Sequence, residues 1–316
     1  MIEVSSVEIR AESMTVQQMR TFCSVYEHGG YSNAEKHLGL SGPTLWEHVK
    51  TLEMIYRRIF FERTGRNVRP TPEGHALYQL LTPLLASIES TFEVIGEEAG
   101  EAPKQVSLVT GVRMMLEELG YPLKQFRRSN PHVKLRLMTS DNQTAQNYVL
   151  DGKADVALLI EPPPAILAKG LTCERLYPIE YLAVLPPKHR FAKKPDLQLE
   201  DLVTEPLVLG NPNTVGRQQF EQAVFRLGLT QPLSVVAETD NSAITIACVR
   251  AGIGVGVIAG RRGGNLARHV TTRSLAKDLG SVNIVAAYRT GRLLTKVVRE
   301  LLDLMKSANV AQAASL

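Results

Sequence analysis

The chain has 316 residues, of which 44% are hydrophobic and 22% are charged. This composition is typical of a folded protein of two or three domains and excludes a disordered chain. The formal net charge is only +4, so the protein is no polycation, and any surface that binds nucleic acid must be local.

The cysteines and the hydropathy pattern indicate where the protein works. Cys23, Cys173 and Cys248 are few, odd in number and far apart, which argues against a disulfide framework and for a reducing compartment. No apolar run approaches the ~18 residues needed to cross a bilayer. The first thirteen residues carry three glutamates and one arginine, unlike a secretory signal. We therefore expect a cytoplasmic protein that does not contact a membrane.

Three short helices are predicted near the start of the chain. Apolar residues at helical spacing from Val16 to Tyr26 indicate the first, which ends at Gly29-Gly30. Ser32 and Asn33 can cap the second, and Ser41 can cap a third that extends to Tyr56, with Pro43 near its first position. In this third helix the core-facing residues are Leu45, Val49 and Leu52, and the outward residues are Thr44, Trp46, Glu47 and Lys50.

A basic hairpin is predicted after these helices. Apolar runs at 59–61 and 68–70 flank a turn that contains glycine, and Arg63, Arg66 and Arg69 lie in or beside it. Between residues 14 and 72 there are eight Lys or Arg and five Glu. Three helices and such a hairpin make a winged helix-turn-helix, whose last helix fits a major groove while its arginines suit a minor groove. An ordinary helical hairpin with a solvated turn is the alternative that these residues leave open.

The following segment, residues 71–102, is acidic and patterned for a single long helix. It contains six glutamates and no Lys or Arg. Pro83 inside it costs about 3 kcal/mol in a helix interior or forces a kink, and the glycines at 96 and 100 end the segment as a hinge. A stripe close to a heptad seam favours pairing with a second subunit, and docking on its own domain is the alternative. The stripe consists of Leu77, Leu81, Leu84, Ile88, Phe92 and Ile95.

The remainder of the chain alternates between predicted strands and helices. This order indicates an α/β domain with a parallel sheet covered by helices. Strands are expected at 106–109, 133–137, 154–160, 181–185, 207–209, 252–258 and 282–288. Helices are expected at 114–126, 142–150, 215–227, 243–250 and 293–305.

Several groups of residues occur together at a spacing typical of one family. They are Met19–Phe22, Gly29–Glu35, Leu38–Leu45, Leu52-Glu53, Phe60–Arg66 and Thr71–Gly74. This series resembles the DNA-binding domain of LysR-type transcriptional regulators. Residues 150–158, 182–189 and 249–255 resemble the effector domain of the same family, whose two-lobed fold is like that of periplasmic solute-binding proteins.

The resemblance implies an organisation in three parts. A winged helix-turn-helix would occupy residues 14–70 and a linker and dimerisation helix residues 71–102. A periplasmic-binding-protein-like (type 2) effector domain would occupy 103–308, with lobe I at 103–165 and 280–308 and lobe II at 172–275. The chain would cross between the lobes near 160–176 and 272–281.

The resemblance also implies a function and the residues that perform it. The protein would be a DNA-binding regulator that responds to a small effector and binds promoter dyads as a homodimer or homotetramer, with RNA polymerase as a further candidate partner. DNA contacts would come from Ser32, Ser41, Pro43, Thr44, Trp46, Glu47, Lys50, Arg63 and Arg66. Subunit contacts would come from Leu77, Leu81, Leu84, Ile88 and Phe92. Effector contacts would come from Thr110, Gly111, Ser140, Asn142, Asn211, Thr214, Asp240, Asn241 and Gly254.

The hydroxyls and amides of the predicted effector site suit a small polar or carboxylated metabolite. For Ser140, Asp141 and Asp240, capping of a helix is at least an equal alternative. Asp141 would also repel an anion, and Arg113 would either offset that charge or point to solvent.

The predicted recognition helix departs from the family at the positions that matter for base contacts. Trp46-Glu47 stands where the family often has Ser-Arg, Gly42 where it usually has Gln, and no glycine ends the helix. Glu47 can accept from a cytosine amino group, and Trp46 offers a donor and an apolar face. Alternatively, Trp46 packs on its own domain and Glu47 pairs with Lys50. We expect an unusual DNA preference, and a regulator with impaired DNA binding that acts by protein contacts is one alternative.

Other motifs do not indicate an enzyme, a cofactor or a metal site. The glycines at 252, 254 and 256 follow a helix, the reverse of the order in a dinucleotide site. Residues 140–142 and 274–277 match motifs of penicillin-recognising enzymes in the wrong order. The seven histidines form no metal-binding pattern. A cytoplasmic solute-binding module is a second alternative, against which the helix-turn-helix counts.

Overall fold

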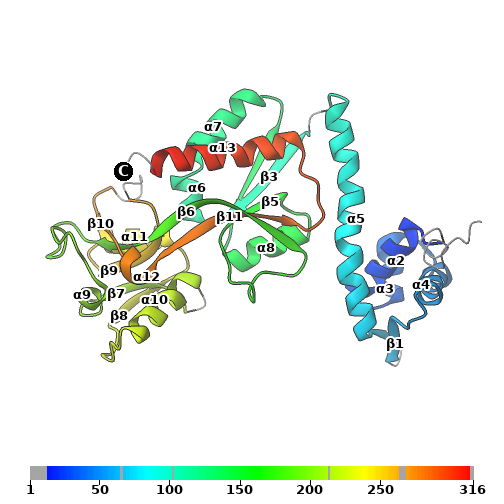
Figure 1. The fold of residues 1–316 in the computed structure, drawn as a ribbon, viewed down its shortest axis with the longest axis horizontal. Coiled ribbons are helices and arrows are strands. Elements are labelled where there is room, and N and C mark those ends of the chain that lie inside the picture. Colours follow the sequence, from blue (N-terminus) through cyan, green and yellow to red (C-terminus); the bar gives the residue numbers. More distant parts are fainter. Residues whose placement is uncertain (1–12, 65–66, 102, 213, 263–267, 314–316) are drawn as a thin grey trace, which may run out of the picture. The chain divides into compact units, whose positions relative to one another are not determined.

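The computed structural model (Figure 1) describes residues 13–64, 67–101, 103–212, 214–262 and 268–313. These residues form two compact units. The N-terminal unit runs to Glu98 and includes Arg289–Leu294, and the C-terminal unit comprises the rest of the chain from Ala99.

The N-terminal unit is a winged helix-turn-helix followed by a long helix, as the sequence predicts. Its β1 and β2 pair antiparallel, with Phe61 opposite Pro70 and Thr64 opposite Asn67, and form the wing. The elements are α2 (Val16–Glu27), α3 (Tyr31–Leu38), α4 (Gly42–Tyr56), β1 (Phe61–Thr64), β2 (Asn67–Pro70) and α5 (Pro72–Glu98).

Local signals in the sequence fix the helix ends. Thr15 and Gln18 form a reciprocal capping box at the start of α2. Ser41 caps α4 as predicted, and Pro43 lies in the first turn of that helix, where a missing N–H costs little. The prediction that Ser32 and Asn33 cap α3 is wrong, because α3 begins at Tyr31 after Gly30.

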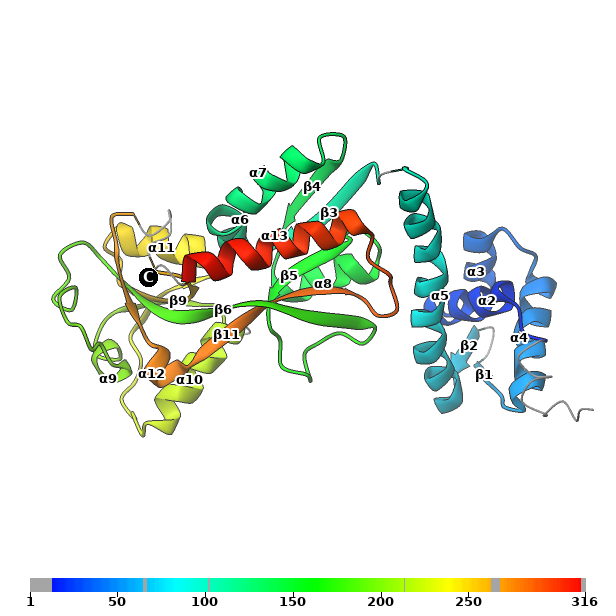
Figure 2. The same ribbon diagram turned by 45° about the horizontal axis from the view of Figure 1, so that its top comes forward.

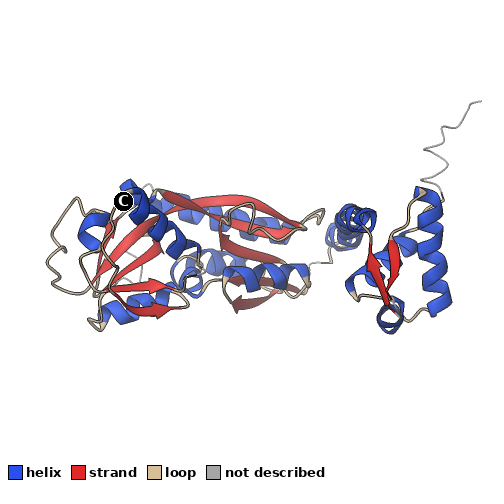
Figure 3. Cartoon of the chain, turned by 90° about the horizontal axis from the view of Figure 1, so that it is seen from below, coloured by secondary structure: helices blue, strands red, loops and turns tan. Residues whose placement is uncertain are grey.

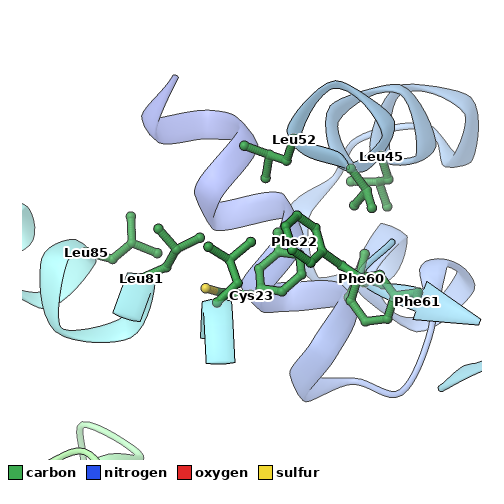
Figure 4. Close-up of a cluster of buried hydrophobic side chains, with 12 residues drawn as sticks. Phe22, Cys23, Leu45, Leu52, Phe60, Phe61, Leu81 and Leu85 are labelled. Atoms are coloured by element: carbon green, nitrogen blue, oxygen red, sulfur yellow. The ribbon is translucent and has the colours of Figure 1, made fainter. Parts of the chain in front are cut away.

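Aromatic and aliphatic side chains from all parts of this unit meet in one core. The Phe22 ring lies 5.4 Å from the Phe60 ring and 5.3 Å from the Phe61 ring, so α2 holds the base of the wing. Leucines of α5 enter the same core, as Figure 4 shows for Leu81 and Leu85. Consequently α5 is part of the N-terminal unit and cannot separate from it without exposing apolar surface.

Two of the subunit contacts predicted on α5 are wrong. Leu77 and Leu81 are buried in the core of their own unit, so for these two the docking alternative holds. Leu84 and Phe92 are exposed as predicted, and Ile88 is half-buried. The helix runs without interruption through Pro83.

The described residues of the C-terminal unit form one sheet of nine strands. The strand order is β4-β3-β5-β11-β6-β9-β7-β8, and β10 pairs with β6. The strands are β3 (Gln105–Thr110), β4 (Lys134–Thr139), β5 (Val156–Ile160), β6 (Leu171–Leu185), β7 (Leu207–Gly210), β8 (Val235–Thr239), β9 (Val255–Gly260), β10 (Thr271–Ser274) and β11 (Ser281–Arg289). The helices are α6 (Val112–Glu117), α7 (Gly120–Ser129), α8 (Asn142–Leu150), α9 (Leu199–Leu202), α10 (Val215–Arg226), α11 (Ser242–Arg250), α12 (Ala276–Leu279) and α13 (Lys296–Ala313).

Two parallel halves of this sheet correspond to the two lobes. β3 runs parallel to β4 and β5, and β7 runs parallel to β8 and β9. Between the halves lie β6 and β11, which connect them in Figure 2. Leu171, at one end of β6, packs in the core of the first half, and Leu182 and Val184 pack in the core of the second. Helices cover the strands in Figure 3, which confirms the predicted two-lobed α/β fold.

The predicted elements differ from the observed ones in several places. The helix expected at 114–126 is two helices, α6 and α7, with the break ahead of Gly120. The strand expected at 181–185 is the end of a longer strand, β6, which begins at Leu171. The strand expected at 252–258 begins three residues later, at Val255. The short strands β8 and β10 and the short helices α9 and α12 were not predicted.

Candidate DNA interface and effector site

The turn before α4 presents the N-terminal end of that helix to solvent. Gly39 ends α3 in the left-handed conformation (φ 66°), which costs glycine little. The backbone N–H of Gly42 donates to the Glu35 carboxylate at 3.3 Å. Ser41 Oγ accepts from the Thr44 backbone N–H at 3.4 Å and lies 2.8 Å from Thr44 Oγ1. The turn is thus held by α3 on one side and by the cap on the other.

Trp46 and Glu47 both lie on the exposed side of α4. Trp46 is 50% exposed, so it does not pack against its own domain. The Lys50 ammonium lies 5.8 Å from the centre of the indole and forms its ion pair with Glu53. The alternative pairing of Glu47 with Lys50 is therefore wrong, and Glu47 is left on the surface without that cation.

Glu53 joins the end of α4 to the wing. Its carboxylate is buried and accepts from the backbone N–H groups of Phe60 at 2.8 Å and Phe61 at 3.4 Å. These bonds satisfy two donors at the point where the chain enters β1. This role of Glu53 was not predicted, although an acidic residue next to the core-facing Leu52 is a signal that could have indicated a buried carboxylate.

The basic residues of the wing remain at the surface. Arg63 and Arg69 are exposed on β1 and β2, and Ser32 is exposed in the first turn of α3. Arg66 lies outside the described residues. His48, on α4, is bound to Thr21 (Nδ1 to Oγ1, 2.9 Å), so it holds α4 against α2.

The predicted effector residues of the first lobe gather at one edge of the sheet. Because β3, β4 and β5 are parallel, their carboxyl ends share an edge. Thr110 is buried there and donates to the Leu158 carbonyl at 3.0 Å. Ser140 donates its backbone N–H to Thr110, and the Asn142 amide donates to the Ile160 carbonyl at 3.2 Å. Gly111 follows Thr110 and precedes α6.

The second lobe repeats this arrangement at the carboxyl ends of β7 and β8. Asn211 donates its backbone N–H to Thr239 at 2.9 Å, which joins the two loops. Thr214 caps α10 and Asn241 caps α11, so both side chains already hold helix ends. Asp240 is exposed beside them. Since α6 follows Gly111, α11 follows Asn241, and α6 contacts α11, the two groups of loops approach each other.

Gly254 does not belong to this group. It precedes β9, and β9 runs parallel to β7, so Gly254 lies at the opposite edge of the sheet from Asn211. A Cβ on Gly254 would lie 2.5 Å from the Pro206 carbonyl oxygen, which explains the glycine by close packing. We therefore remove Gly254 from the predicted effector site.

The charged residues near the first lobe's edge also differ from expectation. Asp141 caps α8, accepting from Gln143 and Thr144. Burial would raise the pKa of the Asp141 carboxyl, but the hydrogen bonds from Thr144 and from the backbone outweigh burial and lower it. Arg113 neither offsets Asp141 nor points to solvent, because it is buried and bound to Glu118.

Comparison with known proteins identifies the family. The sequence model of bacterial regulatory helix-turn-helix proteins of the lysR family matches residues 16–75, and that of the LysR substrate binding domain matches residues 106–309. The two matches cover most of the chain, which therefore belongs to the LysR family of transcriptional regulators.

Individual relatives agree with this assignment. The chain is 26% identical over 251 residues to the HTH-type transcriptional regulator CbbR of Xanthobacter flavus, covering 79% of this chain and 74% of that protein. It is 24% identical over 250 residues to a probable RuBisCO transcriptional regulator of Cyanophora paradoxa, covering 78% of this chain and 76% of that protein. A mutant of OxyR from Corynebacterium glutamicum, solved with bound hydrogen peroxide, has the same fold, with a TM-score of 0.57, 22% identity and 95% of each chain covered.

The chain is thus a DNA-binding, effector-responsive regulator of the LysR type, and this assignment is favoured over the alternatives of a solute-binding module and a regulator with impaired DNA binding. The relatives are transcriptional regulators and not enzymes. Among the described residues, no helix combines the length and the apolar character that crossing a bilayer requires. Nor do His, Cys, Asp and Glu side chains in that part of the chain gather into a group that could hold a metal ion.

Proposed function

We propose that this regulator reads promoter dyads through the N-terminal half of α4 and the arginines of the wing. The observation that carries the proposal is the Glu53 carboxylate, which holds the base of the wing against the end of α4. Because that geometry is fixed, an exposed helix start and a basic hairpin act as one surface. In such a surface the first residues of the recognition helix contact base edges and the cations contact phosphates.

The residues proposed to contact DNA have separate roles. Ser41, Pro43 and Thr44 form the start of α4, and Trp46 and Glu47 lie on its exposed side, where they can contact bases. Lys50 keeps its position through Glu53, and Ser32 and Arg63, both exposed, are proposed to contact phosphates. Arg66 retains its proposed role from the sequence alone.

The exposed side of α5 is proposed to pair two subunits into a dimer, and dimers into a tetramer. A dyad in DNA requires two-fold symmetric proteins. Leu80, Leu84, Phe92 and Ile95 are all exposed at helical spacing on this helix. The protein would act in the cytoplasm, where promoter DNA lies, with RNA polymerase as a further candidate partner.

The effector is proposed to be a small polar or carboxylated molecule bound where the loops of the two lobes approach each other. The candidate contacts in the first lobe are Gly111, Ser140 and Asn142, with Thr110 buried behind them. In the second lobe they are Asn211, Thr214, Asp240 and Asn241. Thr214 and Asn241 cap helices, so the backbone N–H groups at the starts of α10 and α11 are also held in place.

Selection of bound sequences from a random DNA pool by the full-length protein tests the proposal. We expect recovery of a dyad with half-sites about one or two helical turns apart, and binding that falls steeply with salt. Failure to enrich any site, with a folded and oligomeric protein, in the absence and presence of candidate metabolites, would overturn the DNA-reading role of α4.

A further inference from the structure

A buried group of ionic side chains lies where the two lobes join. Arg113 is in α6 of the first lobe, Glu118 follows that helix, and Tyr177 is on the connecting strand β6. Arg113 is bound to one Glu118 oxygen, and the Tyr177 hydroxyl donates to the other. All three side chains are almost fully buried. None of them was predicted as part of the effector site.

Arg261, which follows β9 of the second lobe, completes this group. Its guanidinium carbon lies 4.7 Å from the centre of the Tyr177 ring. Arg113 packs on the backbone just before it, because a Cβ on Gly260 would lie 3.6 Å from the Arg113 guanidinium carbon. The group therefore contains side chains from both lobes and from the strand between them.

The guanidinium of Arg261 lacks hydrogen-bond partners within the part of the chain that the structure describes. Nε, Nη1 and Nη2 are each covered from solvent, and none donates a hydrogen bond. Buried polar atoms in native proteins are nearly always hydrogen-bonded. The Tyr177 ring attracts the Arg261 cation, but an aromatic ring does not replace the oxygen acceptors that the guanidinium N–H groups need.

The charges of the group do not balance. Burial and the adjacent Glu118 carboxylate raise the pKa of the Tyr177 hydroxyl well above its usual value, so Tyr177 is neutral. Burial lowers the pKa of Arg261 and outweighs the nearby Glu118 carboxylate, which raises it, yet guanidinium groups stay protonated in proteins. Two cations thus share one carboxylate, and an unpaired buried cation is strongly unfavourable.

We propose that Arg261 and Arg113 bind an oxyanion, a carboxylate or a phosphate group of the effector, at the junction of the two lobes. The proposal rests on the proposed effector response and names its ligand class. A guanidinium fork matches carboxylate and phosphate oxygens in pairs, and the three unpartnered nitrogens of Arg261 form such a fork. The anion would remove the uncompensated charge.

The test is calorimetric thermal unfolding of the full-length protein with potassium phosphate or potassium succinate, against potassium chloride at equal ionic strength. Calorimetry is needed because the one tryptophan, Trp46, lies in the N-terminal unit. A probe at ten times its Kd should raise the Tm of the C-terminal unit by about 3–6 °C. A response to phosphate alone, or to succinate alone, distinguishes a phosphate from a carboxylate ligand.

Three variants decide whether Arg261 is responsible. Arg261→Met should abolish the anion-dependent shift without lowering the Tm in chloride, because it removes an unpaired charge. Arg261→Lys keeps the charge without the fork and should bind at least about tenfold more weakly. Arg262→Gln is the matched control, since Arg262 is exposed and paired with Glu180 at 2.8 Å. It should behave as the wild type.

The proposal is overturned if neither anion at 10 mM, about ten times a millimolar Kd, stabilises the wild type, or if Arg261→Met is stabilised equally. If Arg261→Met has a lower Tm than the wild type in chloride, Arg261 stabilises the fold without an anion, and this result would also count against the proposal. Should Arg261→Met not fold, Arg261→Lys and the wild type still carry the test. DNA selection with the same preparations separates the two proposals, because DNA binding with no anion response refutes only the anion site.

Discussion

The substitution Phe92→Glu should break the association of subunits. The exposed face of α5 consists of Leu80, Leu84, Phe92 and Ile95, which are 65%, 52%, 75% and 67% exposed. Four large apolar side chains on one side of a single helix are unusual for a surface in contact with water. Phe92 is the most exposed of them, so its substitution leaves the core of its own unit intact.

The size of the effect follows from the area that a partner would cover. Complete burial of such a side chain contributes about 1.5–3 kcal/mol. Three quarters of Phe92 is exposed, so a partner helix would gain about 1–2 kcal/mol from it in each subunit. A two-fold dimer contains this contact twice, which gives about 2–4 kcal/mol, or roughly a 30- to 700-fold increase in Kd.

Sedimentation velocity across a concentration series measures this change directly. The matched control is Phe225→Glu, since Phe225 on α10 is 85% exposed and carries no proposed subunit contact. The control should leave the association constant unchanged. If Phe92→Glu associates as tightly as the wild type, the exposed face of α5 does not pair subunits and the argument from its apolar area fails.

Four further predictions concern the other parts of the molecule. Arg63→Ala should weaken binding to all DNA sequences and reduce the salt slope by about one, whereas Trp46→Ala should change the preferred sequence. Binding isotherms at several salt concentrations check both, with exposed Arg136→Ala as control, and an unchanged preference would refute base contact by Trp46. Leu81→Ala should destabilise the N-terminal unit by about 2–5 kcal/mol, measured by urea unfolding; a loss below 1 kcal/mol would contradict the burial of Leu81 in its core. Asp141→Ala should cost the C-terminal unit about 1 kcal/mol through the lost cap of α8, with exposed Asp240→Ala, which caps no helix, as control. Because the folded pKa of Asp141 is lowered, its contribution is present above the unfolded pKa and lost as the pH falls through the folded pKa. Acid titration of stability should therefore show a smaller loss for Asp141→Ala, and an identical loss would refute the cap.

The N-terminal unit could be predicted well because its signals are local. Ser41 as a cap, Pro43 in a first turn and the repeat of Leu45, Val49 and Leu52 act within one or two helical turns. Such short-range signals do not depend on partners elsewhere in the chain. The alternation of strands and helices likewise indicated an α/β domain, whereas the two lobes were implied by the family resemblance.

The face that each residue of α5 presents could not be predicted from spacing alone. The heptad pattern identified one stripe, but spacing does not show how far along α5 the core of the N-terminal unit extends. Leu77 and Leu81 enter the core beside Phe22, while Leu84 and Phe92 are on the outside. Leu80, which the pattern omitted, belongs to the exposed face.

The proposed anion site shows the same limit more sharply. Arg261 and Arg262 are adjacent, and both follow the end of β9 at Gly260. Arg262 pairs with Glu180 at the surface, and Arg261 is buried against Tyr177. Their positions depend on where β9 ends and on its pairing with β6, in which Glu180 lies opposite Gly260. The strand expected at 252–258 was misplaced by two or three residues. Therefore the chemistry of this site comes from long-range pairing, and the sequence around position 261 contains no local sign of it.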